Sequence, residues 1–96
     1  MENIRIQYFG SVRAAAGRPE DESPAAGMSL YSLLLKLAGD YGEAFRGELL
    51  AAGGGKLRDD LTVTVNGAII SHEAAEEIVL RPGDTLALFP IFPGGG

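Results

Sequence analysis

The ten residues from Leu61 to Ile70, LTVTVNGAII, carry the firmest local folding signal in the chain. The first five residues alternate between apolar and threonine side chains, as a strand with one buried face does. Asn66 and Gly67 then form the dipeptide that most readily adopts the two positive φ angles of a type I′ turn. The segment AII follows as the returning strand, so the sequence predicts an antiparallel hairpin.

Two further segments alternate in the same way. In IRIQYF, Ile4, Ile6 and Tyr8 fall on one side, and Phe9 falls on the opposite, polar side. In the segment LRPGDTLALFP, a Pro-Gly turn precedes a strand. Leu86 and Leu88 lie on one side of this strand, and Ala87 and Phe89 lie on the other. Each strand therefore presents one aromatic side chain on the face away from the core.

One segment, SLYSLLLKLAGDYG, has the period of an amphipathic helix. Ser29 is a good N-cap and Gly42 a good stop, and between them one face carries the apolar side chains of Leu30, Leu33, Leu34, Leu37 and Tyr41. A short helix is expected over 43–50 and a loop over 51–56. Residues 11–28 show no clear period; their Gly and Pro residues indicate turns, with one candidate strand near 20–26.

This order of elements predicts an α+β fold, in which one main helix packs on one face of a mixed sheet. The other face stays open. On it we place Phe9 and Phe89, together with Ile69 or Ile70. Large apolar side chains gathered on the surface of a small domain usually mark a protein contact.

Composition excludes several classes of function. The chain has 96 residues, enough for one core, and a net charge of −5, which argues against nucleic-acid binding and favours a basic protein partner. It has no cysteine, so disulfides, thiolate catalysis and cysteine metal sites are excluded. No apolar run is long enough to span a membrane and no signal peptide is evident, so we expect no membrane contact and a cytoplasmic location. The acidic run at 20–22 is interpreted first as a solvated loop.

No residue set suggests catalysis by this chain alone. The segment GGGK is followed by Leu57, which breaks the phosphate-loop pattern. Asp59 and Asp60 are neighbours that would point to opposite sides of a strand, and they are expected at the start of the hairpin. His72 is the only histidine, so we interpret it as a surface residue and expect no metal site.

The C-terminal segment, FPIFPGGG, points to a function for the chain end. Three terminal glycines would arise by chance in roughly 0.3% of chains of this glycine content. Glycines can thread a channel too narrow for side chains, and the seven residues after Phe89 can extend at most about 24 Å. We therefore expect a domain over 1–90 and a flexible, functional tail over 91–96; a frayed terminus is the alternative.

These segments together resemble a known family. IQYFGSVRAAAG, SLYSLLLKLAGDYG, VTVNGAIIS, RPGDTLALFP and the terminal glycines are similar, in order and spacing, to the small subunit of molybdopterin synthase (MoaD-like) and to related ubiquitin-like sulfur carriers. The resemblance covers nearly the whole chain. It implies a ubiquitin-like β-grasp fold.

The resemblance also implies a chemistry for the terminus. An E1-like adenylating enzyme of the MoeB or ThiF type would adenylate the C-terminal glycine with ATP, and a sulfur donor would convert it to a thiocarboxylate. The large subunit of molybdopterin synthase (MoaE type) would then accept the sulfur; the chain itself binds no cofactor. The implied reacting end is Gly96 with Gly95, and the positions that match the family's hydrophobic contact surface are Phe9, Ile69 and Phe89. Ile91, Phe92 and Gly94 of the tail are further candidates for partner binding.

The tail departs from the family, which commonly has F-P-P, two more residues and a final Gly-Gly. One glycine is extra here, so either Gly96 reacts directly or it is removed to leave Gly95. Phe92 and Pro93 are also unusual, which leaves other sulfur recipients open: cysteine synthesis, thiamin synthesis, or lysine side chains for a ubiquitin-like modifier. A β-grasp interaction module without covalent chemistry is the alternative from another class.

Overall fold

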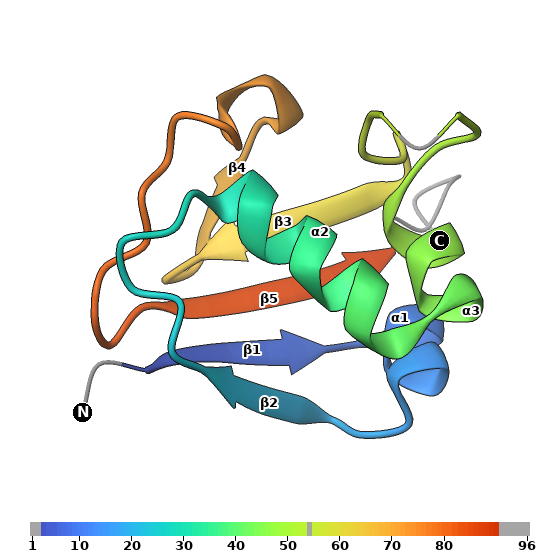
Figure 1. Cartoon of the computed structure of the whole chain (residues 1–96), viewed down its shortest axis with the longest axis horizontal. Coiled ribbons are helices and arrows are strands. Elements are labelled where there is room, and N and C mark those ends of the chain that lie inside the picture. Colours follow the sequence, from blue (N-terminus) through green and yellow to red (C-terminus); the bar gives the residue numbers. More distant parts are fainter. Residues whose placement is uncertain (1–2, 54, 91–96) are drawn as a thin grey trace.

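The computed structural model describes residues 3–53 and 55–90 (Figure 1). The tail expected over 91–96, after a domain over 1–90, lies outside the described residues. The elements follow the chain in this order: β1 (Ile4–Tyr8), α1 (Gly10–Ala16), β2 (Glu20–Ser23), α2 (Leu30–Tyr41), α3 (Glu43–Leu49), β3 (Leu61–Val65), β4 (Ala68–Ile70), the 3-10 helix η1 (His72–Ala74) and β5 (Thr85–Pro90).

The five strands form one mixed sheet in the order β2-β1-β5-β3-β4. The two central strands, β1 and β5, run parallel, and all other neighbouring pairs are antiparallel. The expected hairpin of β3 and β4 is confirmed, with Asn66 at φ 53° and Gly67 at φ 87°, both positive as a type I′ turn requires. The first and last strands of the described chain therefore lie side by side in the sheet.

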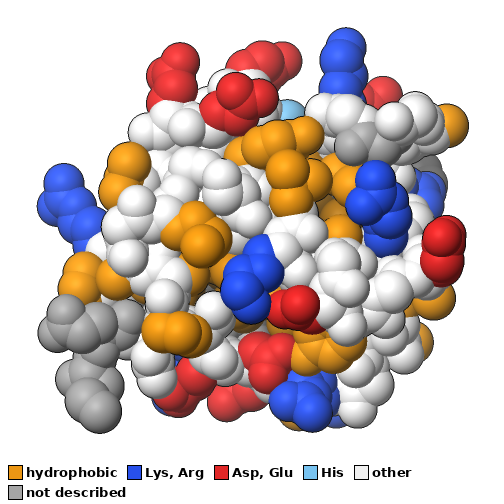
Figure 2. Space-filling view, in the orientation of Figure 1, with side chains coloured by type: hydrophobic (Ala, Val, Ile, Leu, Met, Phe, Trp, Pro, Cys, Tyr) orange, Lys and Arg blue, Asp and Glu red, His pale blue; other side chains and the backbone are white. Residues whose placement is uncertain are grey.

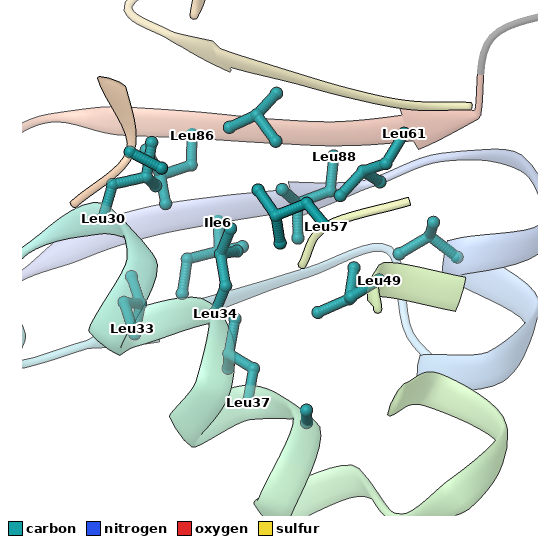
Figure 3. Close-up of a cluster of buried hydrophobic side chains, with 14 of the residues drawn as sticks. Ile6, Leu30, Leu33, Leu34, Leu37, Leu49, Leu57, Leu61, Leu86 and Leu88 are labelled. Atoms are coloured by element: carbon teal, nitrogen blue, oxygen red, sulfur yellow. The ribbon is translucent and has the colours of Figure 1, made fainter. Parts of the chain in front are cut away.

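Helix α2 crosses one face of the sheet, as the α+β prediction requires (Figure 1). The Ser29 side chain accepts a hydrogen bond from the Ser32 amide, so Ser29 is the N-cap, and Gly42 ends the helix at φ 95°. The apolar face of α2 packs on the strands through side chains that Figure 3 shows meeting between the layers: Ile6, Leu30, Leu33, Leu34, Leu37, Leu86 and Leu88. The alternation therefore assigned Leu86 and Leu88 correctly to the core.

Residues 10–16 correct the sequence analysis. They form α1, whereas we expected only turns there. The helix has two turns, one buried side chain (Val12) and no side-chain N-cap, so no apolar period was visible. It contacts α3 and β5, and such packing can stabilise a helix too short to form alone.

The acidic run also differs from the solvated loop that we expected. It forms the edge strand β2, within the candidate range 20–26, and the side chain of Asp21 lies on the core side. Asp21 accepts hydrogen bonds from the hydroxyls of Tyr8 (3.0 Å) and Tyr41 and from the Arg18 guanidinium (3.0 Å). Only Glu20 and Glu22 are exposed.

These contacts change the pKa of each partner. Burial favours the neutral form of Asp21, but hydrogen bonds from Tyr41, Tyr8 and Arg18 outweigh it and hold the pKa of this carboxyl below its ordinary value of 3.8. Burial is the largest cause that raises the pKa of the Tyr8 hydroxyl and that of the Tyr41 hydroxyl, and the hydrogen bond to Asp21 is the second. The ionised carboxylate therefore fastens the edge strand to β1 and α2.

We expect Asp21→Asn to lower the free energy of unfolding at neutral pH by about 1 kcal/mol, because a neutral amide accepts these hydrogen bonds more weakly. The pKa of Asp21 is lower in the folded protein than in the unfolded chain. Its contribution is thus fully present above pH 3.8 and is lost as the pH falls through the folded pKa. Urea unfolding of both proteins across this range measures the difference, which should shrink in acid.

Asp40→Asn is the matched control, because Asp40 is 57% exposed and pairs only with Lys36 on the surface of α2. It should change stability little at any pH. A difference for Asp21→Asn that stays constant from neutral pH into acid would contradict the role assigned to the carboxylate.

Candidate functional site

The candidate site is the sheet face opposite α2, which we call the open face. Alternation and strand register place the following side chains on it: Arg5, Gln7, Glu20, Glu22, Thr62, Thr64, Ile69, Thr85, Ala87 and Phe89. Phe9 follows β1 directly and joins them. No helix of residues 3–53 and 55–90 packs across this face.

The two aromatic residues predicted for this face are in contact. The rings of Phe9 and Phe89 meet edge to face with their centroids 5.9 Å apart. They are neighbours because β1 and β5 are parallel, and the Phe9 amide donates a hydrogen bond to the Leu88 carbonyl (3.0 Å). Phe9 is 44% exposed and Phe89 is half-buried, so the pair forms an apolar surface at the end of β5.

Of the two isoleucines considered for the open face, the structure selects Ile69. It pairs with Thr64 on β3 and is 76% exposed, whereas Ile70 turns toward the core beside Val63. Ile69 lies two strands from Phe89, with threonines of β3 between them. A hollow of about 290 Å³ adjoins Ile69 and Thr62.

Thr62, Thr64 and Ala87 also belong to this surface, although they were not predicted for it from the sequence. The register pairs Thr62 with Phe89, and it places Thr64 between Ile69 on one side and Ala87 on the other. The signal that could have found them is the same alternation that revealed the strands, since Thr62 and Thr64 fall on the side away from Leu61 and Val63.

The far edge of the open face is acidic. Glu20 and Glu22 of β2 lie beside Gln7 and Arg5, and Arg5 approaches Glu22 to 3.9 Å. Both partners of this ion pair are more than half exposed, so it contributes little to stability. A partner that covers the whole face would meet apolar and threonine side chains, with carboxylates along one edge.

The opposite side of the molecule has a different character. Figure 2 views the side that α2 covers, where hydrophobic side chains are separated by charged ones. Among them are Lys36 and Asp40, which pair along the helix at 3.0 Å. This mixture is typical of a solvated surface.

The other polar residues weighed from the sequence form no catalytic group. Asp59 and Asp60 directly precede β3, as expected. Asp60 accepts a hydrogen bond from Arg58, and Asp59 is exposed. His72 is half-buried, not a plain surface residue, because its Nε2 lies 2.7 Å from the Leu61 carbonyl. Within the described part of the chain, no three His, Asp or Glu side chains are placed to hold a metal ion.

Five residues predicted for the site lie outside the described residues: Ile91, Phe92, Gly94, Gly95 and Gly96. They continue from Pro90, the last residue of β5, which ends beside the aromatic pair. In Figure 1, β1 and β5 both point toward the end of the sheet where α1 and α3 lie. No helix in residues 3–53 and 55–90 is long and apolar enough to cross a membrane.

Comparison with known proteins identifies the fold. SAMP1 from Haloferax volcanii superposes with a TM-score of 0.80 at 24% identity, over 97% of this chain and 99% of that one. Urm1 from Trypanosoma brucei gives 0.77 at 23% identity, over 98% and 96%. A Pyrococcus furiosus protein provisionally described as molybdopterin converting factor, subunit 1, gives 0.72 at 22%, over 96% and 100%. No curated protein sequence matches significantly.

These likenesses confirm the ubiquitin-like β-grasp fold. The family that matches the sequence is described as the ThiS family, and the match runs over residues 6–95, which is nearly the whole chain. The chain therefore belongs to the ThiS family, whose ubiquitin-like fold is that of sulfur carriers and protein modifiers.

Proposed function

We propose that this chain is a sulfur carrier for molybdopterin synthesis. In this proposal Gly96 is the working C-terminus, which an E1-like enzyme adenylates and a sulfur donor converts to a thiocarboxylate. The observation that carries the proposal is the apolar pair of Phe9 and Phe89 on the open face, directly beside the end of β5. Membership in the ThiS family supports it.

The chemistry explains why the terminus must leave the domain. A carboxylate is a poor acyl donor, so one of its oxygens first attacks the α-phosphorus of ATP and pyrophosphate departs. Sulfur at the oxidation level of hydrosulfide then attacks the acyl carbon, and the C–S bond forms as the bond to AMP breaks. Both ATP and the sulfur donor belong to the activating enzyme in this scheme, so the chain contributes the acyl group and the means of delivering it.

The open face supplies the means of delivery. A partner that binds Phe9, Phe89 and Ile69 holds the end of β5 against its own surface. The seven residues after Phe89 extend at most about 24 Å, enough to reach an active site inside that partner. Two partners would use this surface in turn: an adenylating enzyme of the MoeB or ThiF type, and the large subunit of molybdopterin synthase (MoaE type) as sulfur acceptor.

ATP–pyrophosphate exchange tests the first step of this proposal. The full chain should stimulate exchange when it is mixed with its cognate E1-like enzyme, ATP and labelled pyrophosphate, because exchange requires reversible formation of the acyl adenylate. A matched reaction without the chain sets the background. Exchange that stays at this background with every adenylating enzyme of the source organism would contradict the proposal.

A second candidate is a ubiquitin-like modifier of lysine side chains. It is favoured by the similarity to SAMP1 and Urm1, which superpose somewhat better than the Pyrococcus protein, and by the unusual Phe92-Pro93 of the tail. The same adenylate would then pass its acyl group to an amine. Isopeptide-linked Gly96 in tryptic peptides of cellular proteins would favour this candidate, or the use of both routes.

A further inference from the structure

We propose that Gly10 is a positioning residue for the C-terminal tail: its missing side chain makes room for Pro90 and so fixes where β5 passes into residues 91–96. This inference rests on the proposed function, because the placement of Pro90 matters most if the chain end must reach a reacting atom. It concerns a contact between the start of α1 and the last residue of β5.

The backbone at Gly10 leaves no space for a side chain. A Cβ atom built at this position would lie 2.9 Å from Cγ of Pro90, a distance that real Cβ atoms essentially never show, and 3.0 Å from Cδ, which is tighter than nine in ten real Cβ contacts. Both atoms belong to the pyrrolidine ring, which cannot rotate away as a flexible side chain can. Gly10 also has a φ of +57°, in the left-handed region that favours glycine.

Neighbouring contacts prevent Pro90 from yielding freely. On one side of β5, Pro90 pairs with Leu61 of β3. On the other side, Phe9 is held by its amide hydrogen bond to Leu88 (3.0 Å) and by its edge-to-face contact with Phe89. The end of β5 thus lies between β3 and the Phe9-Gly10 corner, and a side chain at Gly10 would push the two apart.

Pro90 is the last described residue before 91–96, so in this inference the Gly10 contact sets the point from which the tail starts. Acyl transfer and adenylation tolerate little displacement of the reacting atoms, and an error of about 1 Å can cost about a hundredfold in rate. Gly10 therefore affects activation through Pro90, although Gly10 need not touch the activating enzyme.

The chain offers a matched control for Gly10→Ala. Gly17, at the other end of the same helix, also has a left-handed φ (+77°), but a Cβ there would meet no atom within 4 Å. Gly17→Ala therefore introduces similar backbone strain without touching Pro90. The double variant Gly10→Ala/Pro90→Ala removes the ring atoms that cause the clash.

The first measurement uses NMR and needs no enzyme. In Gly10→Ala we expect weaker NOEs between the rings of Phe9 and Phe89 and at least about tenfold faster hydrogen exchange of the Phe9 amide, which donates to Leu88. Gly17→Ala should keep both at wild-type values. Wild-type NOEs and exchange in Gly10→Ala, or equal losses in both variants, would overturn the inference.

The second measurement is the maximal rate of pyrophosphate exchange at saturating carrier, with the dissociation constant measured separately. Gly10→Ala should lower this rate about tenfold, and Gly17→Ala less than about twofold. In the Pro90→Ala background the effect of Gly10→Ala should fall below about threefold. Equal effects in both backgrounds would overturn the inference. No exchange with the wild-type chain would instead contradict the proposed function, and the NMR result would then decide the role of Gly10 alone.

Discussion

A chain that ends at Gly95 is expected to lose at least about a hundredfold of the pyrophosphate exchange rate that the full chain supports. Removing one residue withdraws the reacting carboxylate by about 3.5 Å, which is well beyond the tolerance for attack on the α-phosphorus of ATP. A chain that ends at Gly94 should be less active still. The three chains are compared at saturating concentrations with the same activating enzyme.

Gly96→Ala tests whether the end of the tail has room for a side chain, because it adds one methyl group and keeps the length of the tail. A channel that accepts only glycine should reject this variant, which should then lose activity as the shortened chains do. Higher activity in the chain that ends at Gly95 would show that Gly96 is removed before use. Wild-type activity in both Gly96→Ala and the Gly95 chain would contradict the assignment of Gly96.

Phe89→Ala is expected to weaken binding of the activating enzyme by about 2 kcal/mol, which is about thirtyfold in the dissociation constant. Phe89 sits at the centre of the proposed contact surface, where it touches Phe9 and adjoins the end of β5. The fold should lose only about 1 kcal/mol, since Phe89 is half-buried and the core side of β5 is formed by Leu86 and Leu88. Titration calorimetry and urea unfolding measure the two effects.

Leu35→Ala is the control for this experiment. Leu35 is 36% exposed on α2, so the variant removes an apolar side chain of the surface on the side away from the open face. It should leave binding unchanged. If Leu35→Ala and Phe89→Ala weakened binding equally, the open face would not be the docking surface.

The elements with a strong local pattern could be predicted from the sequence. The hairpin follows from the alternation in LTVTV and from the positive φ angles that Asn66 and Gly67 accept, both properties of neighbouring residues. Helix α2 follows from its apolar period, its Ser29 cap and its Gly42 stop. Here local preference and tertiary packing agree.

The elements that the sequence did not reveal depend on distant partners. Helix α1 has only two turns and is supported by α3 and β5. Asp21 looked like one of three solvated acids, because its partners Tyr8 and Tyr41 lie 13 and 20 residues away along the chain. No spacing rule connects such residues before the sheet and helix are assembled.

The candidate site shows the same division. Alternation predicted correctly that Phe9 and Phe89 face away from the core, but it left Ile69 and Ile70 as alternatives, of which only Ile69 lies on the open face. The contact between Phe9 and Phe89 requires the parallel pairing of β1 with β5, which joins segments about 80 residues apart. The fit of Pro90 against Gly10 depends on the same pairing and on a backbone angle that the sequence alone does not specify.

The most direct test of the account is the intact mass of the chain after incubation with its activating enzyme, ATP and a sulfur donor. We expect a mass gain that corresponds to one oxygen replaced by sulfur, located by fragmentation at Gly96, and no gain when ATP is omitted. A chain whose mass stays unchanged, although the activating enzyme sulfurates its known carrier in the same reaction, would contradict the claim that this protein carries sulfur at its C-terminus.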